Sequence, residues 1–84
     1  MPIEVRFFAT LIDFVGKRKL YVEKAGSVRE LLEFLESQYF GFKKQLEAGY
    51  IILVNGLNIE HLKGLETPLN DGDVVSIFPP AGGG

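Results

Sequence analysis

The sequence contains no cysteine and only one histidine, His61. The absence of cysteine excludes disulfide bonds, thiolate metal sites and a thiol nucleophile, and it leaves the redox state of the compartment open. Because no second histidine stands at ligand spacing from His61, we interpret it as a solvated loop residue and predict no metal site.

The sequence also lacks an excess of one charge and a long apolar run. It has 9 Lys and Arg against 11 Asp and Glu, a net charge of −2, and the basic residues are scattered. Such a chain has no cationic footprint of the kind that nucleic acid or an anionic membrane requires. Its first residues alternate polar and apolar side chains, unlike a signal peptide or a membrane span. We therefore predict a cytoplasmic protein whose partners are other proteins, not nucleic acid or membrane.

What the chain does have is the composition of a small folded protein. It has 84 residues, of which 46% are apolar and 24% are charged. This balance is ordinary for a globular protein and too hydrophobic for a disordered one. We predict one domain at residues 1–78 and a flexible C-terminal tail at residues 79–84.

The first half of the domain shows two strand patterns and one helix pattern. Residues 3–9 and 19–23 alternate apolar and polar side chains, which predicts a hairpin with a loop of roughly eight residues. Ser27 and Glu30 have the spacing of a capping box, in which each side chain bonds the other residue's amide, so a helix begins there. It is expected to end at Gly41, and residues 42–46 could add a short helical turn. One helical face carries the apolar side chains Val28, Leu31, Leu32, Leu35 and Tyr39.

The second half reads as short strands and turns. Residues 51–54 form an apolar strand pattern, Asn55-Gly56 favours a tight turn, and residues 60–68 are irregular. A turn at residues 70–73 precedes a strand at residues 74–78. The order predicts an α+β fold of the ubiquitin-like β-grasp type, a mixed sheet with one main amphipathic helix across one face. Ferredoxin-like and other small α+β folds share this order, so it does not decide between them.

The tail has a composition that favours a chemical role for its last residue. Pro79 and Pro80 favour an extended chain, and Gly82-Gly83-Gly84 remove side-chain bulk. Extended, these six residues reach at most roughly 20 Å, which suits a narrow channel. The reactive group would be the Gly84 carboxylate, which becomes an electrophile when ATP converts it to an acyl-adenylate. The chain has neither phosphate-binding glycine motif, so we predict that it binds no cofactor itself and that a partner enzyme uses the ATP.

Six short motifs occur in order along the whole chain. They are Phe7-Phe8-Ala9, Ser27-Val28-Arg29-Glu30-Leu31-Leu32, Val54-Asn55-Gly56, Leu69-Asn70-Asp71-Gly72-Asp73-Val74-Val75, Phe78-Pro79-Pro80 and Gly83-Gly84. Together they resemble the MoaD/ThiS family, which includes the small subunit of molybdopterin synthase. The segment 61–65 resembles the longer, archaeal-type members, whereas Gly82 departs from the Ser, Thr or Ala of many relatives.

The resemblance implies a sulfur carrier with no self-contained active site. A ubiquitin-activating-like enzyme would adenylate Gly84, a sulfur donor protein would help convert it to a thiocarboxylate, and the sulfur would pass to a pterin precursor in the large synthase subunit. Gly83 would contribute to the reaction through its lack of a side chain. Phe78 would anchor the base of the tail. The metal served, molybdenum or tungsten, stays open.

Three other features of the sequence have competing interpretations. Phe8 and Phe78 alternate out of phase with the buried residues of their strands, so we predict a partner-binding patch rather than incidental exposure. Asp71 and Asp73 flank a glycine and are interpreted as turn formers, not as a catalytic pair. The run Lys17-Arg18-Lys19 is most simply a solvated loop, and contact with an acidic partner surface is the alternative.

Other functions of the chain also remain open. A sulfur carrier for thiamine thiazole or thiolated nucleosides, and a ubiquitin-like modifier of lysines, would share the activation step. A plain interaction domain with an inert tail would not.

Overall fold

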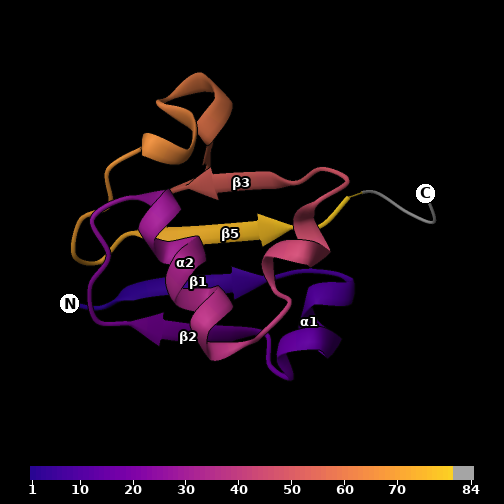
Figure 1. Cartoon of the computed structure of the whole chain (residues 1–84). Helices are drawn as coiled ribbons and strands as arrows, with labels where there is room; N and C mark the ends of the chain where they lie inside the picture. Colours follow the sequence, from indigo (N-terminus) through magenta and orange to yellow (C-terminus); the bar gives the residue numbers. More distant parts are fainter. Residues whose placement is uncertain (81–84) are drawn as a thin grey trace.

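The computed structural model describes residues 1–80, which form a five-stranded mixed sheet crossed by one main helix, α2 (Val28–Gln38) (Figure 1). The sheet order is β2-β1-β5-β3-β4. Within the sheet, the adjacent strands β1 and β5 are parallel, and the other adjacent pairs are antiparallel. This arrangement confirms the predicted β-grasp fold. The strands are β1 (Ile3–Phe7), β2 (Lys19–Val22), β3 (Ile51–Val54), β4 (Leu57–Asn58) and β5 (Val74–Phe78).

The core lies between α2 and one face of the sheet. Strand residues alternate between this face and the opposite one, which no helix of the described chain covers (Figure 1). Removing a buried leucine such as Leu35 would destabilise the fold by roughly 2–5 kcal/mol. Within residues 1–80, no helix has the length and hydrophobicity needed to cross a bilayer. The fully buried side chains include Phe7, Phe42, Ile3, Leu11, Leu31, Leu35, Ile52, Ile59 and Ile77.

The start of α2 follows the predicted capping pattern with one change. The Ser27 hydroxyl accepts a hydrogen bond from the Glu30 amide at 3.2 Å. The Glu30 carboxylate, however, accepts from the Gly26 amide at 3.3 Å rather than from that of Ser27. A Cβ at residue 26 would lie 2.8 Å from a Glu30 oxygen, so the glycine leaves room for this arrangement.

The segment between β1 and β2 differs most from the sequence prediction. Residue 9 was expected inside the first strand and the connection to be a loop, but β1 ends at Phe7 and α1 (Thr10–Val15) follows. The Leu11 amide donates to the Phe8 carbonyl at 3.1 Å, and Ala9 has a φ of +53°. This sharp turn between Phe8 and Leu11 prevents the strand from continuing.

Burial explains why α1 forms. Leu11 and Val15 lie one helical turn apart and are both buried, and Gly16 ends the helix with a φ of +88°. Figure 1 shows α1 at the end of the sheet where β5 finishes. This short helix therefore closes the core beside the point where the chain leaves the sheet.

The second half matches the predicted strands and turns. Asn55 and Gly56 have φ values of +51° and +85°, as the tight turn between β3 and β4 requires. The predicted helical turn near residue 42 is the 3₁₀ helix η1 (Lys43–Leu46). Residues 60–68, expected to be irregular, contain parts of two further 3₁₀ turns, η2 (Ile59–His61) and η3 (Gly64–Glu66).

Candidate functional site

The candidate site begins where β5 ends. Phe78 is the last residue of β5, and the half-buried Pro79 and Pro80 follow it directly. The predicted tail residues Gly82, Gly83 and Gly84 lie outside the described residues, so the reactive role of Gly84 stays a prediction. What the structure describes is the base from which the tail leaves the domain.

Two aromatic side chains form this base. Phe7 and Ile77 are partners in the parallel pairing of β1 and β5, which brings the next residues, Phe8 and Phe78, together. Their rings stack with centroids 4.2 Å apart and an angle of 14° between the ring planes. Both aromatics thus lie together outside the buried core, as predicted, although Phe8 directly follows β1 instead of lying within it. The stack packs Phe78 against Phe8.

A third apolar residue extends the stack across the sheet. Ile51 pairs with Phe78 between β3 and β5, and it alternates with the buried Ile52, so it lies on the open face. Its exposed fraction is 51%, large for an isoleucine within a strand. Phe8, Phe78 and Ile51 form the tail-base patch, a row of apolar side chains at the end of β1, the end of β5 and the start of β3. The sequence analysis missed Ile51 because an apolar run gives no sign of which residues face solvent.

Charged side chains lie beside the tail-base patch on the same face. Arg6 donates to the Glu4 carboxylate two residues earlier in β1. This hydrogen bond lowers the pKa of Glu4, and the positive charges of Arg6 and Lys19 add to the effect. Lys19 lies opposite Arg6 in β2, with its Nζ 6.0 Å from the centre of the Tyr21 ring. The patch is therefore bordered by cations on the β2 side.

The loop after α2 is held by another carboxylate. Glu36 accepts hydrogen bonds from the amides of Gly41 and Lys43, each at 2.8 Å, and these two bonds lower its pKa. Phe42, which lies between Gly41 and Lys43 in the chain, is fully buried. Phe40, which precedes Gly41, is 93% exposed. Glu36 thereby fixes a loop that lies toward the tail end of the sheet (Figure 1).

The predicted roles of three polar residues can be compared with the structure. His61 is exposed, as expected, although it ends the short helix η2 instead of lying in a loop. The Asp73 carboxylate accepts from the Asn55 side chain at 3.0 Å and from the Asn70 amide at 2.8 Å, which confirms it as a turn former. Asp71 is exposed in the same turn. Residues 1–80 hold no group of three or more His, Asp or Glu side chains placed to bind a metal ion.

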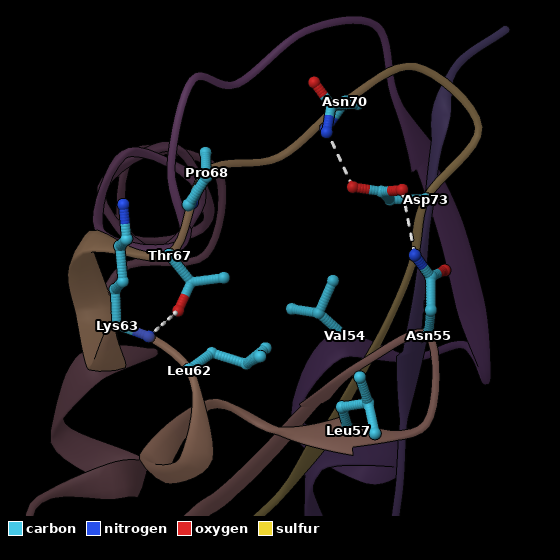
Figure 2. Close-up of a pocket in the computed structure, with 9 residues that line it drawn as sticks. All are labelled: Val54, Asn55, Leu57, Leu62, Lys63, Thr67, Pro68, Asn70 and Asp73. Carbon is cyan, nitrogen blue, oxygen red and sulfur yellow. Dashed lines mark hydrogen bonds between the residues drawn. The ribbon is translucent and has the colours of Figure 1, made fainter.

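A pocket of about 440 Å³, drawn in Figure 2, lies where β3 ends and β5 begins, at the other end of β5 from Phe78. Several of its polar groups are hydrogen-bonded within the chain: the Thr67 hydroxyl accepts from the Lys63 amide at 3.1 Å, and the Asn55 side chain donates to Asp73 at 3.0 Å. Leu57 and Leu62 supply apolar walls.

Comparisons with known proteins bear on the whole chain. The family model described as "ThiS family" matches residues 5–84. Small archaeal modifier protein 3 of Haloferax volcanii is 41% identical over the full length of both chains. The solution structure of small archaeal modifier protein 1 from Methanosarcina acetivorans has a TM-score of 0.86 and 33% identity, covering 99% of this chain and 96% of that one. A complex of subunits 1 and 2 of the Helicobacter pylori molybdopterin-converting factor contains a chain with 34% identity and a TM-score of 0.68, and the match covers all of both chains.

Proposed function

Because this chain belongs to the ThiS family, we propose that it is a sulfur-carrier protein whose Gly84 carboxylate is adenylated and then thiocarboxylated by a partner enzyme. The family match includes Gly83 and Gly84, and this observation carries the proposal. In the described part of the chain, the stacked Phe8 and Phe78 give the tail a fixed starting point at Pro79.

The chemistry of the proposed reaction divides between the chain and its partners. A Gly84 carboxylate oxygen attacks the α-phosphorus of ATP in the activating enzyme, and pyrophosphate leaves. Sulfide supplied by a donor protein then displaces AMP from the acyl-adenylate, so one oxygen is exchanged for one sulfur. The carrier contributes an unhindered carboxylate on a tail of defined length, and it binds no cofactor of its own.

The tail-base patch is the proposed docking surface for the activating enzyme and for a large synthase subunit. Its members Phe8, Phe78 and Ile51 are only partly covered within the described chain. Aromatic anchors of this kind account for much of the binding energy in protein interfaces. Docking there would fix the distance between the sheet and the catalytic centre that receives Gly84.

The first sulfur acceptor that we propose is a pterin precursor in molybdenum or tungsten cofactor synthesis. The similarity to a subunit of the H. pylori molybdopterin-converting factor supports it. Carriers for thiamine thiazole or thiolated nucleosides would use the same first step. The cytoplasmic location stays a prediction.

Protein modification is a second candidate function, because the full-length H. volcanii relative is named a small archaeal modifier. The two functions differ in the nucleophile that attacks activated Gly84. Sulfide gives the thiocarboxylate, whereas a lysine amine gives an isopeptide bond to another protein. Both require the same carboxylate and the same docking surface.

Mass spectrometry of the intact protein tests the proposal. The chain is incubated with ATP, its cognate adenylating enzyme and a sulfur donor, and its mass should rise by the difference between one sulfur and one oxygen. A reaction without ATP is the control. An unchanged mass with an enzyme that still exchanges pyrophosphate into ATP on this carrier would contradict thiocarboxylation. Lysine-linked products in the same reaction would support the modifier function.

A further inference from the structure

A second pocket of about 390 Å³ lies directly beside the tail-base patch. Its lining comes from the end of β1 and the start of β2: Arg6, Phe7, Phe8, Arg18 and Lys19. The Phe7 amide donates to the Arg18 carbonyl at 2.8 Å, and Arg6 pairs with Lys19 in the antiparallel ladder. The backbone of this cationic pocket is therefore held by strand pairing, although its charged side chains are exposed.

The cationic pocket has more positive charge than its neighbours neutralise. Of its three cations, Arg6 is bonded to Glu4, while Arg18 and Lys19 form no ion pair with an acidic side chain of residues 1–80. Lys24, Lys44 and Lys63 also form no ion pair within residues 1–80, so the pocket is distinguished by the clustering of its three cations and not by the lack of ion pairs. In a chain with a net charge of −2, this pocket is a local positive site.

The electrostatics of Glu4 agree with this description. The hydrogen bond from Arg6 lowers the pKa of Glu4 most, and the charges of Arg6 and Lys19 lower it further. Glu4 does not line the pocket, but its carboxylate is bonded to Arg6, which does. An additional carboxylate from another molecule would experience the same favourable field.

We propose that the cationic pocket binds a carboxylate-bearing segment of the activating enzyme, with an apolar residue of that segment resting on Phe8. The inference rests on the proposed function, because it assumes that the enzyme docks at the tail-base patch. Phe8 belongs to both surfaces, so one partner segment can cover the patch and the pocket together. The inference corresponds to the second of the two earlier interpretations of Lys17-Arg18-Lys19, contact with an acidic partner surface, for Arg18 and Lys19.

A protein carboxylate suits this position better than the phosphates of ATP. The cationic pocket lies at the base of the tail, and the reacting carboxylate is six residues further along the chain, up to roughly 20 Å away when extended. When the tail is extended, the phosphates engaged in the reaction therefore lie away from Arg18. Complementary charges near an interface mainly accelerate association, and salt screens their effect.

Charge reversal measures this contribution. The variant Arg18→Glu/Lys19→Glu should associate with the cognate activating enzyme about tenfold more slowly, or worse, at ~0.1 M salt. At ~1 M salt, where the Debye length falls from about 10 Å to about 3 Å, its association rate should approach that of the unmodified chain. Rates are measured by stopped flow, and circular dichroism checks that the variant is folded.

The matched control is Lys24→Glu/Lys63→Glu, which changes the net charge equally. Lys24 and Lys63 line pockets at the other end of the sheet, so the local inference predicts a much smaller loss of rate. Equal losses in both double variants would show only an effect of net charge and would overturn the inference, as would no loss in either.

Two further outcomes separate the inference from other causes. If the unmodified chain does not bind the enzyme at all, the proposed function fails as well. If the unmodified chain binds and is adenylated, but charge reversal leaves the association rate unchanged, only the inference fails. Inorganic pyrophosphate is the remaining probe: if it binds at Arg18 and Lys19 by NMR and leaves enzyme association unchanged, the pocket is a phosphate site and the inference is overturned.

Discussion

The two ends of the sheet use their side chains in opposite ways. Where β5 begins, the Asn55 side chain bonds both the Asp73 carboxylate and the Val74 amide, at 3.0 and 2.9 Å. Where β5 ends, Phe8 and Phe78 contact each other, and the nearby Arg18 has no acidic partner in residues 1–80. At the first end the Asn55 and Asp73 side chains bond each other and the neighbouring backbone, whereas the second end presents stacked aromatic and clustered cationic groups.

This difference separates stability from function along a single strand. Hydrogen bonds that fix a turn stabilise the folded state, and they leave little for a partner to bind. Exposed aromatic and cationic groups add less to folding and more to association. We expect substitutions at the turn end to lower the melting temperature and substitutions at the tail end to lower activity, with little overlap.

The strongest test of this separation changes only the length of the tail. Adding one alanine after Gly84, or deleting Gly84, should abolish sulfur transfer while folding and docking stay nearly normal. One residue shifts the terminal carboxylate by roughly 3.5 Å. A misplacement of about 1 Å can slow a reaction on the order of a hundredfold. Sulfur transfer is assayed with purified partners.

The deletion also provides an internal control, because Gly83 then becomes the last residue and the terminal residue type is unchanged. Melting temperature and binding affinity are measured for each variant. Turnover equal to that of the unmodified chain in both variants would refute the assignment of Gly84 as the reacting residue.

Truncating the aromatic stack should have the second-largest effect, a loss of partner binding. Phe8→Ala and Phe78→Ala are each expected to weaken binding of the activating enzyme by roughly 2 kcal/mol, about 30-fold in Kd. Calorimetry gives the affinity, and circular dichroism shows whether the fold persists. Phe40→Ala is the matched control, because Phe40 is 93% exposed and lies outside the tail-base patch. Unchanged affinity in both patch variants would reject the patch.

The reverse experiment is made at the turn end. Asp73→Ala removes the acceptor for the Asn55 side chain and the Asn70 amide. It should cost about 1–2 kcal/mol of folding free energy, a fall of roughly 5–15 °C in Tm, with enzyme affinity unchanged. Asp71→Ala, in the same turn but exposed, should change Tm very little. A loss of affinity without a loss of stability in Asp73→Ala would break the separation.

The smallest expected effect concerns the turn that follows Phe8. Ala9 has a φ of +53°, a conformation that favours glycine. Ala9→Gly should relieve this strain and stabilise the fold by up to about 1 kcal/mol, measured by urea unfolding. Gly56→Ala, at a φ of +85°, should do the opposite. If Ala9→Gly destabilises the protein, the turn is not strained in the way that its φ indicates.

The sequence predicted those parts of the fold in which local chemistry and burial agree. The Ser27 cap and the turn at Asn55-Gly56 depend on neighbouring residues alone, and each was placed correctly. The strands at residues 51–54 and 74–78 were also predicted with their observed bounds.

The sequence did not predict features that depend on distant neighbours. α1 was missed because its only signals are the spacing of Leu11 and Val15 and the glycine at residue 16, which are too few in a segment of six residues. Ile51 joined the candidate site only once the register of β3 against β5 was known. The bonds of Asn55 with Asp73 likewise connect residues 18 apart in the sequence.

The position of β5 has a consequence for how the protein is made. β5 is the last strand in the sequence, yet it lies between β1 and β3, which have no direct pairing with each other. During synthesis the two hairpins can therefore join into one sheet only when β5 has left the ribosome. A prematurely terminated chain that stops before Val74 lacks this joining strand together with Phe78 and Gly84. Folding and the capacity to be activated thus arise in the same late step, and incomplete products would display neither.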